Sequence, residues 1–225
     1  MPRNPRFLGE TPLDLPVGPP KILSMPQSDD GLSVEYWRTG WRKIDSGYRV
    51  VKQRTTRAML LVAGKTVGQF DFREFKVEPY TSNDLFFLSM DEDSQSTSDL
   101  ASVLCANWED IEEITDYGDI LELHRAWIHP SYSRKGRLTR AILATIDALH
   151  AKHALFILKA FPLEYEGKTD DNNFSDFRRR QAALMRHYQK TLGVQPLPNP
   201  SDIEGWMYAI PERLRRAFLP MPCAQ

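Results

Sequence analysis

Residues 122–150 read "ELHRAWIHPSYSRKGRLTRAILATIDALH", in which a strand pattern, a basic turn with one glycine and a helix pattern follow one another. The strand pattern begins at residue 119 and ends at Pro130, which has no backbone N–H to give to a sheet. After the turn, Leu138 starts a series of apolar residues at helical spacing, which predicts an amphipathic helix of about three turns. The turn is either a simple connection or an anion site, because the first N–H groups of a helix lack partners and carry partial positive charge.

Strand and helix patterns alternate on both sides of this stretch. Residues 58–75 predict a hairpin around a Gly-Lys-Thr turn, residues 85–89 predict a short strand, and residues 97–108 predict a helix that Ser96 or Ser98 caps. The remaining expected elements are a buried strand at 154–161, a helix through 178–194 that Gly193 ends, and a strand at 205–211. This order predicts an α/β or α+β fold, in which helices cover both faces of a mixed sheet.

The first 30 residues are rich in proline, which disfavours long helices and central strands. We therefore divide the chain into a Pro-rich N-terminal arm, residues 1–50, that packs on the domain, and one domain of residues 51–225. A chain of 225 residues can bury a sizeable core without disulfides or metal.

Composition excludes several classes of protein. Hydrophobic residues make up 41% of the chain, charged residues 26%, and the net charge is −1, so neither disorder nor a general attraction to nucleic acid is indicated. Cys105 and Cys223 are too few for a disulfide framework and lack the spacing of zinc ligands, and no run approaches the ~20 apolar residues of a membrane span. We expect a cytoplasmic protein without a metal or a membrane partner, and leave open whether it forms a homodimer.

The motif "IHPSYSRKGRLTRAIL", residues 128–143, resembles the central motif of the GNAT N-acetyltransferase superfamily. The matching residues are Ile128, Pro130, Tyr132, Lys135 and Gly136. Two later segments agree with the resemblance: "LFILKAFPLEYEG" as the strand after the motif helix, and "ALMRHYQKTLGVQPL", which is similar to the family's YxxLGF helix end. The resemblance covers about residues 55 to 210 and implies a GNAT-like mixed, mostly antiparallel central sheet flanked by helices.

The same resemblance implies acetyl-CoA as co-substrate and a splay between the motif strand and the strand after it, in which acetyl-CoA lies. The implied cofactor-binding residues are Ala126, Ile128, Ser133, Arg134, Lys135, Gly136, Arg137 and Leu138. Backbone donors from Ser133 to Leu138 would hold the pyrophosphate, and the N–H near Ala126 would polarise the thioester carbonyl.

Three residues are candidates for the chemistry. By resemblance, Tyr188 would protonate the departing thiolate, and Glu122 occupies the position of the general base in some members. His124 is the rival base, because the unperturbed pKa of histidine suits that role. Strict alternation predicts that Glu122, His124, Ala126 and Ile128 share one face of their strand.

The predicted function is transfer of an acetyl group to a primary amine by direct transfer in a ternary complex. The alternative is a catalytically inactive GNAT-fold binding or regulatory protein, because Ser133 stands where Arg or Gln is usual and Leu138 replaces a final Gly or Ala. Nucleic-acid binding through the arginines at 134–140 and 178–180 is a third class and is not expected. The acceptor stays open; Asp residues in "EGKTDDNNFSD", residues 166–176, would favour a cationic amine.

Overall fold

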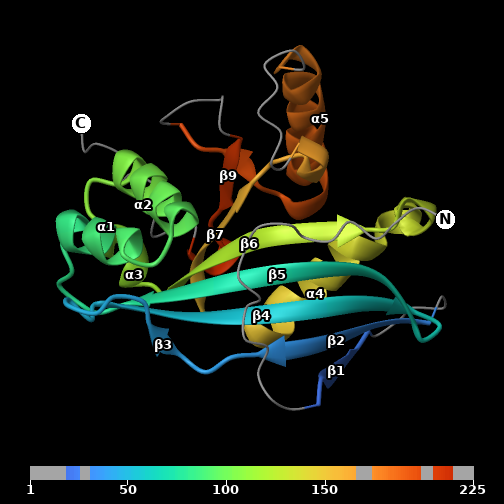
Figure 1. Ribbon diagram of the computed structural model, residues 1–225, viewed down its shortest axis with the longest axis horizontal. Coiled ribbons are helices and arrows are strands. Elements are labelled where there is room, and N and C mark those ends of the chain that lie inside the picture. The colour runs from blue at the N-terminus through green and yellow to red at the C-terminus, as the bar shows by residue number, and fades with distance from the viewer. Residues whose placement is uncertain (1–18, 26–30, 166–173, 199–204, 215–225) are drawn as a thin grey trace, which may run out of the picture.

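The computed structural model describes residues 19–25, 31–165, 174–198 and 205–214, in which nine strands form one sheet flanked by helices (Figure 1). The strands are β1 (Lys21–Ser24), β2 (Leu32–Arg38), β3 (Arg42–Lys43), β4 (Val51–Val62), β5 (Lys65–Val77), β6 (Asp119–Ile128), β7 (His153–Lys159), β8 (Gln195–Pro196) and β9 (Trp206–Ala209). The helices are α1 (Asn83–Asp91), α2 (Gln95–Asn107), α3 (Glu112–Thr115), α4 (Arg137–Leu149) and α5 (Phe174–Leu192).

The strand order is β1-β2-β4-β5-β6-β7-β9-β8, and β3 pairs with β4. Among the described strands only β6 and β7 pair in parallel, and all other pairs are antiparallel. The predicted mixed, mostly antiparallel sheet with flanking helices is therefore confirmed.

Strands β4 and β5 form the predicted hairpin, with a shifted turn. Ala63 and Gly64 occupy the turn with φ angles of 49° and 75°, the left-handed conformation that a tight two-residue hairpin requires. Lys65 and Thr66 are consequently the first residues of β5 and do not belong to the turn.

The predicted strand at residues 85–89 is wrong, because this segment lies in helix α1. The Ser82 side chain accepts a hydrogen bond from the N–H of Leu85 and caps the helix. Phe86 and Met90, one helical turn apart, are both buried against α2. A short apolar run is compatible with either a strand or a buried helix, and here the cap at Ser82 favours the helix.

The other expected elements are confirmed in type. Helix α2 is capped by Ser94 and not by Ser96 or Ser98; α4 and β7 follow as expected; and α5 ends at Gly193, which has a φ of 70°. No helix in the described ranges is both long and apolar enough to cross a membrane.

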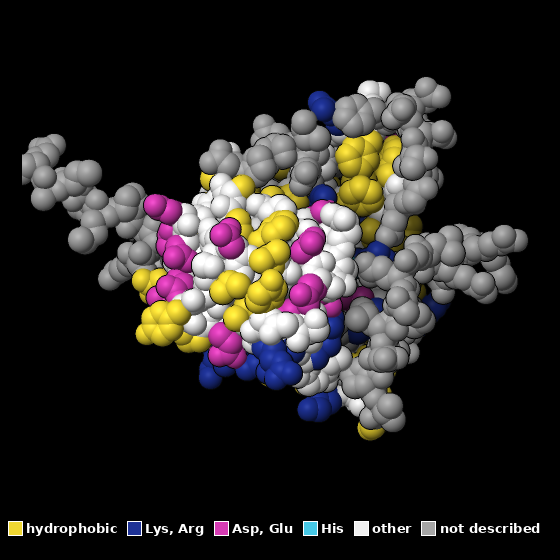
Figure 2. All heavy atoms as spheres, turned by 60° about the vertical axis from the view of Figure 1, so that its left-hand side comes forward, with side chains coloured by type: hydrophobic (Ala, Val, Ile, Leu, Met, Phe, Trp, Pro, Cys, Tyr) yellow, Lys and Arg dark blue, Asp and Glu magenta, His cyan; other side chains and the backbone are white. Residues whose placement is uncertain are grey.

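Two hydrophobic cores lie on opposite faces of the sheet. Helices α4 and α5 pack on one face, and α1, α2 and α3 on the other (Figure 1). Between Lys76 and His124 the sequence contains no Lys, Arg or His. Figure 2 accordingly shows Asp and Glu around hydrophobic side chains on the α1–α3 side, with Lys and Arg gathered along its lower border.

Part of the expected N-terminal arm belongs to the sheet. Strand β1 pairs with β2 and β2 pairs with β4, so residues 21–24 and 32–38 extend the sheet at its edge. Residues 1–18 and 26–30 lie outside the described residues. The domain boundary at residue 50 stays a prediction.

A bulge in β6 decides the geometry of the centre of the sheet. Arg125 pairs with Asp71 and Leu123 with Phe72, which leaves His124 as an extra residue. After the bulge, each side chain of β6 lies on the face opposite to the one that strict alternation predicts. Glu122 therefore does not share a face with Ala126, and the prediction of strict alternation is wrong. The parallel pairing with β7 also ends at Leu123, opposite Leu158, and β7 ends one residue later, so the last residues of β6 have no partner in β7, as the predicted splay requires.

Gly118 lets β6 and β7 start side by side. Its φ is 148°, and a Cβ atom there would lie 2.0 Å from the carbonyl oxygen of Lys152. We predict that Gly118→Ala lowers the free energy of unfolding by about 3 kcal/mol, because backbone must move to accept the methyl group. Chemical denaturation measures this, with Gly47→Ala as the control, since nothing lies within 4 Å of a Cβ at Gly47. Equal losses in the two variants would contradict this account of the junction.

Candidate active site

A cavity of about 560 Å³ opens at the splay, between the end of β6, the start of α4 and one face of α5. It brings together predicted residues from three separate parts of the chain. Those that line it are Ala126, Ile128, Ser133, Gly136, Leu138 and Tyr188.

The turn at the cavity's edge leaves the start of α4 uncapped by a side chain. Lys135 and Gly136 have left-handed φ angles of 69° and 61°, and Gly136 is the N-cap residue. The Ser133 hydroxyl donates to the carbonyl of Pro130 at 2.8 Å and does not cap the helix. No side chain therefore caps the first turn of α4, and the N–H groups at the start of a helix attract anions.

Leu138, the unusual residue of the motif, lines the cavity and packs against the core beneath α4. Its side chain is therefore part of the apolar wall.

The cations of the turn lie at the surface. Arg134 and Lys135 are exposed, and the Arg137 guanidinium lies 5.9 Å from the centre of the Tyr132 ring. None of these three predicted residues is among the described residues that line the cavity. Arg180 of α5 lines it instead, and its Nε donates to Asp176 at 2.8 Å.

The edge of β6 beyond the bulge presents backbone donors to the splay. The N–H of His129 donates to Val67 on the β5 side at 2.8 Å. Successive N–H groups of a strand point to opposite edges, so those of Ala126 and Ile128 point away from β5 and toward the splay. Ala126 is thus in position to donate to a carbonyl oxygen there.

Tyr188 projects from α5 to the same place. It is half-buried and lines both the large cavity and a smaller one beside it. Burial raises the pKa of its hydroxyl to about 12, so the side chain is protonated at neutral pH. Within the described residues its hydroxyl forms no hydrogen bond, so it is available to a ligand.

Glu122 and His124 belong to a buried charged group on the α1–α3 face. The Arg73 guanidinium donates to both oxygens of Glu122, at 2.6 and 2.9 Å, and His124 Nδ1 lies 3.4 Å from Glu122 Oε1. Burial alone would raise the pKa of Glu122, but the charges and hydrogen bonds of Arg73 and His124 lower it to about 2. Glu122 is therefore ionised and held, which suits an anchor better than a general base.

The smaller cavity, about 40 Å³, lies where β6 and β7 part and adjoins the large one at Ala126 and Tyr188. Its other lining residues include His124, Arg125 and Lys159. Arg125 and Lys159 were not predicted from the sequence, because strict alternation put Arg125 on the wrong face and nothing near Lys159 signals a site. Phe161 and Arg180 were not predicted either, although the Phe-Pro pair after β7 and the helix start at 178–181 could have suggested them.

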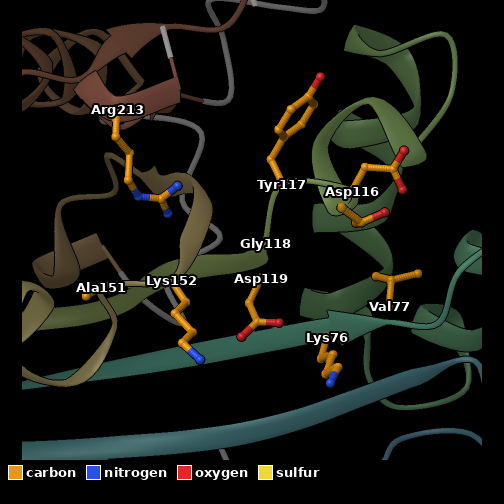
Figure 3. A pocket seen from close by; sticks show the side chains of 10 residues that line it. Lys76, Val77, Asp116, Tyr117, Gly118, Asp119, Ala151, Lys152 and Arg213 are labelled. Carbon is orange, nitrogen blue, oxygen red and sulfur yellow. The ribbon is translucent and has the colours of Figure 1, made fainter. Parts of the chain in front are cut away.

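A third cavity, about 450 Å³, lies at the opposite end of β6 and contains none of the predicted site residues (Figure 3). Arg213 and Lys152 stand on one side of it, and Asp116 and Tyr117 on the other. Burial, followed by the charge of Glu74, raises the pKa of Asp119 on its wall to about 6. The described residues contain no group of His, Cys, Asp and Glu that could hold a metal ion.

Comparisons with known proteins give distant similarities only. No family model matches the chain, and no curated protein matches it. Among solved structures, it is similar to a polyamine N-acetyltransferase of Drosophila melanogaster that forms N-acetylagmatine, with 11% identity, 68% of this chain and 74% of that chain covered, and a TM-score of 0.40.

Two further solved structures are similar to the same extent. One is the apo form of a variant agmatine N-acetyltransferase, with 12% identity, 68% and 73% coverage and a TM-score of 0.38. The other is a mosquito arylalkylamine N-acetyltransferase-like protein, with 10% identity, 68% and 74% coverage and a TM-score of 0.39. The chain itself has the mixed, mostly antiparallel sheet and the splayed strand pair expected from its GNAT-like motif.

Proposed function

We propose that the protein transfers the acetyl group of acetyl-CoA to a primary amine within a ternary complex. The observation that carries the proposal is the cavity in the splay, which joins the uncapped start of α4, the free edge of β6 and the hydroxyl of Tyr188. A thioester with a phosphate-bearing tail needs these three features at one place.

The cavity suits acetyl-CoA in size and chemistry. Its volume of about 560 Å³ is in the range of cofactor sites, and apolar residues such as Ile128, Leu138 and Leu184 form much of its wall. The pyrophosphate would lie on the backbone N–H groups around Gly136, where even an added Cβ would point into open space. The cations Arg134, Lys135 and Arg137 would add attraction from the surface.

The chemistry follows from the groups at the splay. The amine nitrogen would attack the thioester carbon, forming the C–N bond while the C–S bond breaks. The N–H of Ala126 would stabilise the charge that develops on the carbonyl oxygen. The thiolate would take its proton from Tyr188, which solvent then reprotonates, and the proton lost by the amine would pass to a base.

His124 is the base that we propose. It lines the smaller cavity together with Ala126, and its Nδ1 faces Glu122. Glu122 would then orient the imidazole, in the same way that a carboxylate orients a catalytic histidine elsewhere. From the sequence, Glu122 was the candidate base by resemblance and His124 its rival; here His124 is the proposed base and Glu122 positions it.

The first test is calorimetry with acetyl-CoA, for which we expect a Kd in the micromolar range. Gly136→Asp and Gly136→Asn place isosteric side chains, one charged and one neutral, at a left-handed position that both residues tolerate. We predict about tenfold weaker binding for the Asp variant than for the Asn variant, because a carboxylate at the start of α4 repels phosphate. Equal affinities of the two variants would show that the pyrophosphate does not bind at this turn. Absence of acetyl-CoA binding to the unmodified protein would contradict the proposed function.

Replacement of the acid tests the chemistry separately from binding. Tyr188→Phe should lower kcat about 100-fold or more while leaving the Kd of acetyl-CoA unchanged, because only the proton donor is lost. Tyr48→Phe, at an exposed site outside the cavity, is the matched control. If the unmodified protein binds acetyl-CoA but acetylates no amine, the alternative of an inactive binding protein is favoured.

The anchoring role of Glu122 predicts a dependence of stability on pH. The pKa of Glu122 is about 2 in the folded state, below the ~4.3 of an unfolded chain, so its contribution is complete above pH ~4.3 and is lost as pH falls toward 2. Glu122→Gln should cost about 3 kcal/mol of unfolding free energy at pH 7 and much less at pH 3. Urea denaturation at both pH values checks this, with exposed Glu109→Gln as the control. A loss that is the same at both pH values would contradict the ion-pair account.

A further inference from the structure

We propose that the acceptor amine carries a carboxylate, and that Lys159 binds this carboxylate on the α1–α3 side of the splay, with Arg125 nearby. This inference rests on the proposed function and specifies its substrate class. It concerns the smaller cavity, where acceptor and donor would meet.

The first observation is the charge of the lining. The described residues that line the two adjoining cavities include Arg125 and Lys159 but no Asp or Glu, and a third cation of the lining, Arg180, is paired with Asp176. A site for a polyamine would need the opposite, because a second ammonium group is stabilised by carboxylates.

The second observation is where the two cations lie. Lys159 is the last residue of β7, next to Leu158, where the pairing with β6 ends. Arg125 is the first residue of β6 after the bulge, opposite Asp71. Both therefore stand at the mouth of the gap through which an amine would reach Ala126.

Lys159 is held by a contact with an aromatic ring. Its Nζ lies 5.3 Å from the centre of the Trp206 ring, on the core of the α1–α3 side. In the part of the chain that the structure describes, its half-buried ammonium meets no carboxylate. A carboxylate of the acceptor would complete this site by a charge-assisted hydrogen bond.

The same cations assist the reaction. Positive charge near an amine disfavours its protonated form and lowers its pKa, which increases the fraction of reactive free amine. A carboxylate on the acceptor offsets the repulsion that would otherwise keep an ammonium ion out. An amino acid or an acidic amine therefore has both a lowered amine pKa and an attractive carboxylate, whereas a diamine has the lowered pKa but its second ammonium group is repelled.

The nearby acids are already bound. Asp71 accepts hydrogen bonds from Arg57 and Gln69, and Glu122 accepts from Arg73. The acidic side chains of α1 to α3 do not line either cavity, and charges beyond about 8 Å are largely screened at physiological salt. Of the Asp residues in the segment 166–176 that were linked to a cationic amine, Asp170 and Asp171 lie outside the described residues, and Asp176 accepts hydrogen bonds from Tyr165 and Arg180.

The test compares 4-aminobutyrate, butylamine and putrescine, which share one straight chain and a terminal amine but end in a carboxylate, a methyl group and an ammonium. Release of free CoA thiol gives kcat/KM for each at constant ionic strength. We expect kcat/KM to be at least about tenfold higher for 4-aminobutyrate than for butylamine, and lowest for putrescine.

Lys159→Met removes the charge and keeps the length of the side chain. It should reduce the preference for 4-aminobutyrate over butylamine about tenfold, through KM, with the Kd of acetyl-CoA unchanged. Lys190→Met, at an exposed position of α5 that lines neither cavity, should change none of these values.

The outcomes separate the two proposals. Acetylation that is fastest with putrescine or butylamine, or a preference that Lys159→Met does not alter, overturns the carboxylate inference and leaves the acetyltransferase intact. Binding of acetyl-CoA without transfer to any of the three amines overturns the transferase proposal and this inference with it.

Discussion

The loss of hydrogen bonding between β6 and β7 beyond Leu123 is the constraint on which the candidate site depends. A parallel strand pair that continued to Ile128 would leave no gap, and its backbone donors would be used within the sheet. The extra residue at His124 stands where this pairing ends and changes the faces of the residues that follow it. One inserted residue thus places Ala126 on the side of the large cavity and Arg125 on the opposite side of the sheet.

Buried ion pairs hold this irregular region in place. Arg73 links β5 to Glu122, one residue before the pairing of β6 with β7 ends. This ion pair and its hydrogen bonds stabilise β6 where the bulge interrupts the backbone ladder. At the other end of α4, Glu74 accepts hydrogen bonds from Arg38 and Arg54, and His150 Nδ1 lies 3.1 Å from it. Burial would raise the pKa of Glu74, but these partners lower it, so the carboxylate stays ionised and fixes the end of α4 against the sheet. The start of α4 is thereby directed at the splay.

Local patterns were sufficient to predict most of the elements. The helix of α4, the continuous apolar strand β7 and the end of α5 at Gly193 each have a signal in their own residues. The prediction of a strand at residues 85–89 was wrong because a short apolar run has no periodicity that distinguishes a strand from a helix. The residue that caps the helix, Ser82, lies outside this run. The residues of the turn and Tyr188 were predicted from the resemblance, and the structure brings Ser133, Gly136, Leu138 and Tyr188 to one cavity.

The sequence by itself determined the type of most elements from β4 to β9 and the turn before α4, because periodicity, glycine and proline act locally. Tyr188 was singled out by the resemblance to the GNAT superfamily. Only the tertiary structure decided which side chains meet at the splay. A bulge depends on how two strands pair, which no run of residues in either strand records, so Glu122 was expected on the wrong face and Arg125 was not expected at all. Lys159 had no signal because its role depends on strands that are distant in sequence and adjacent in space.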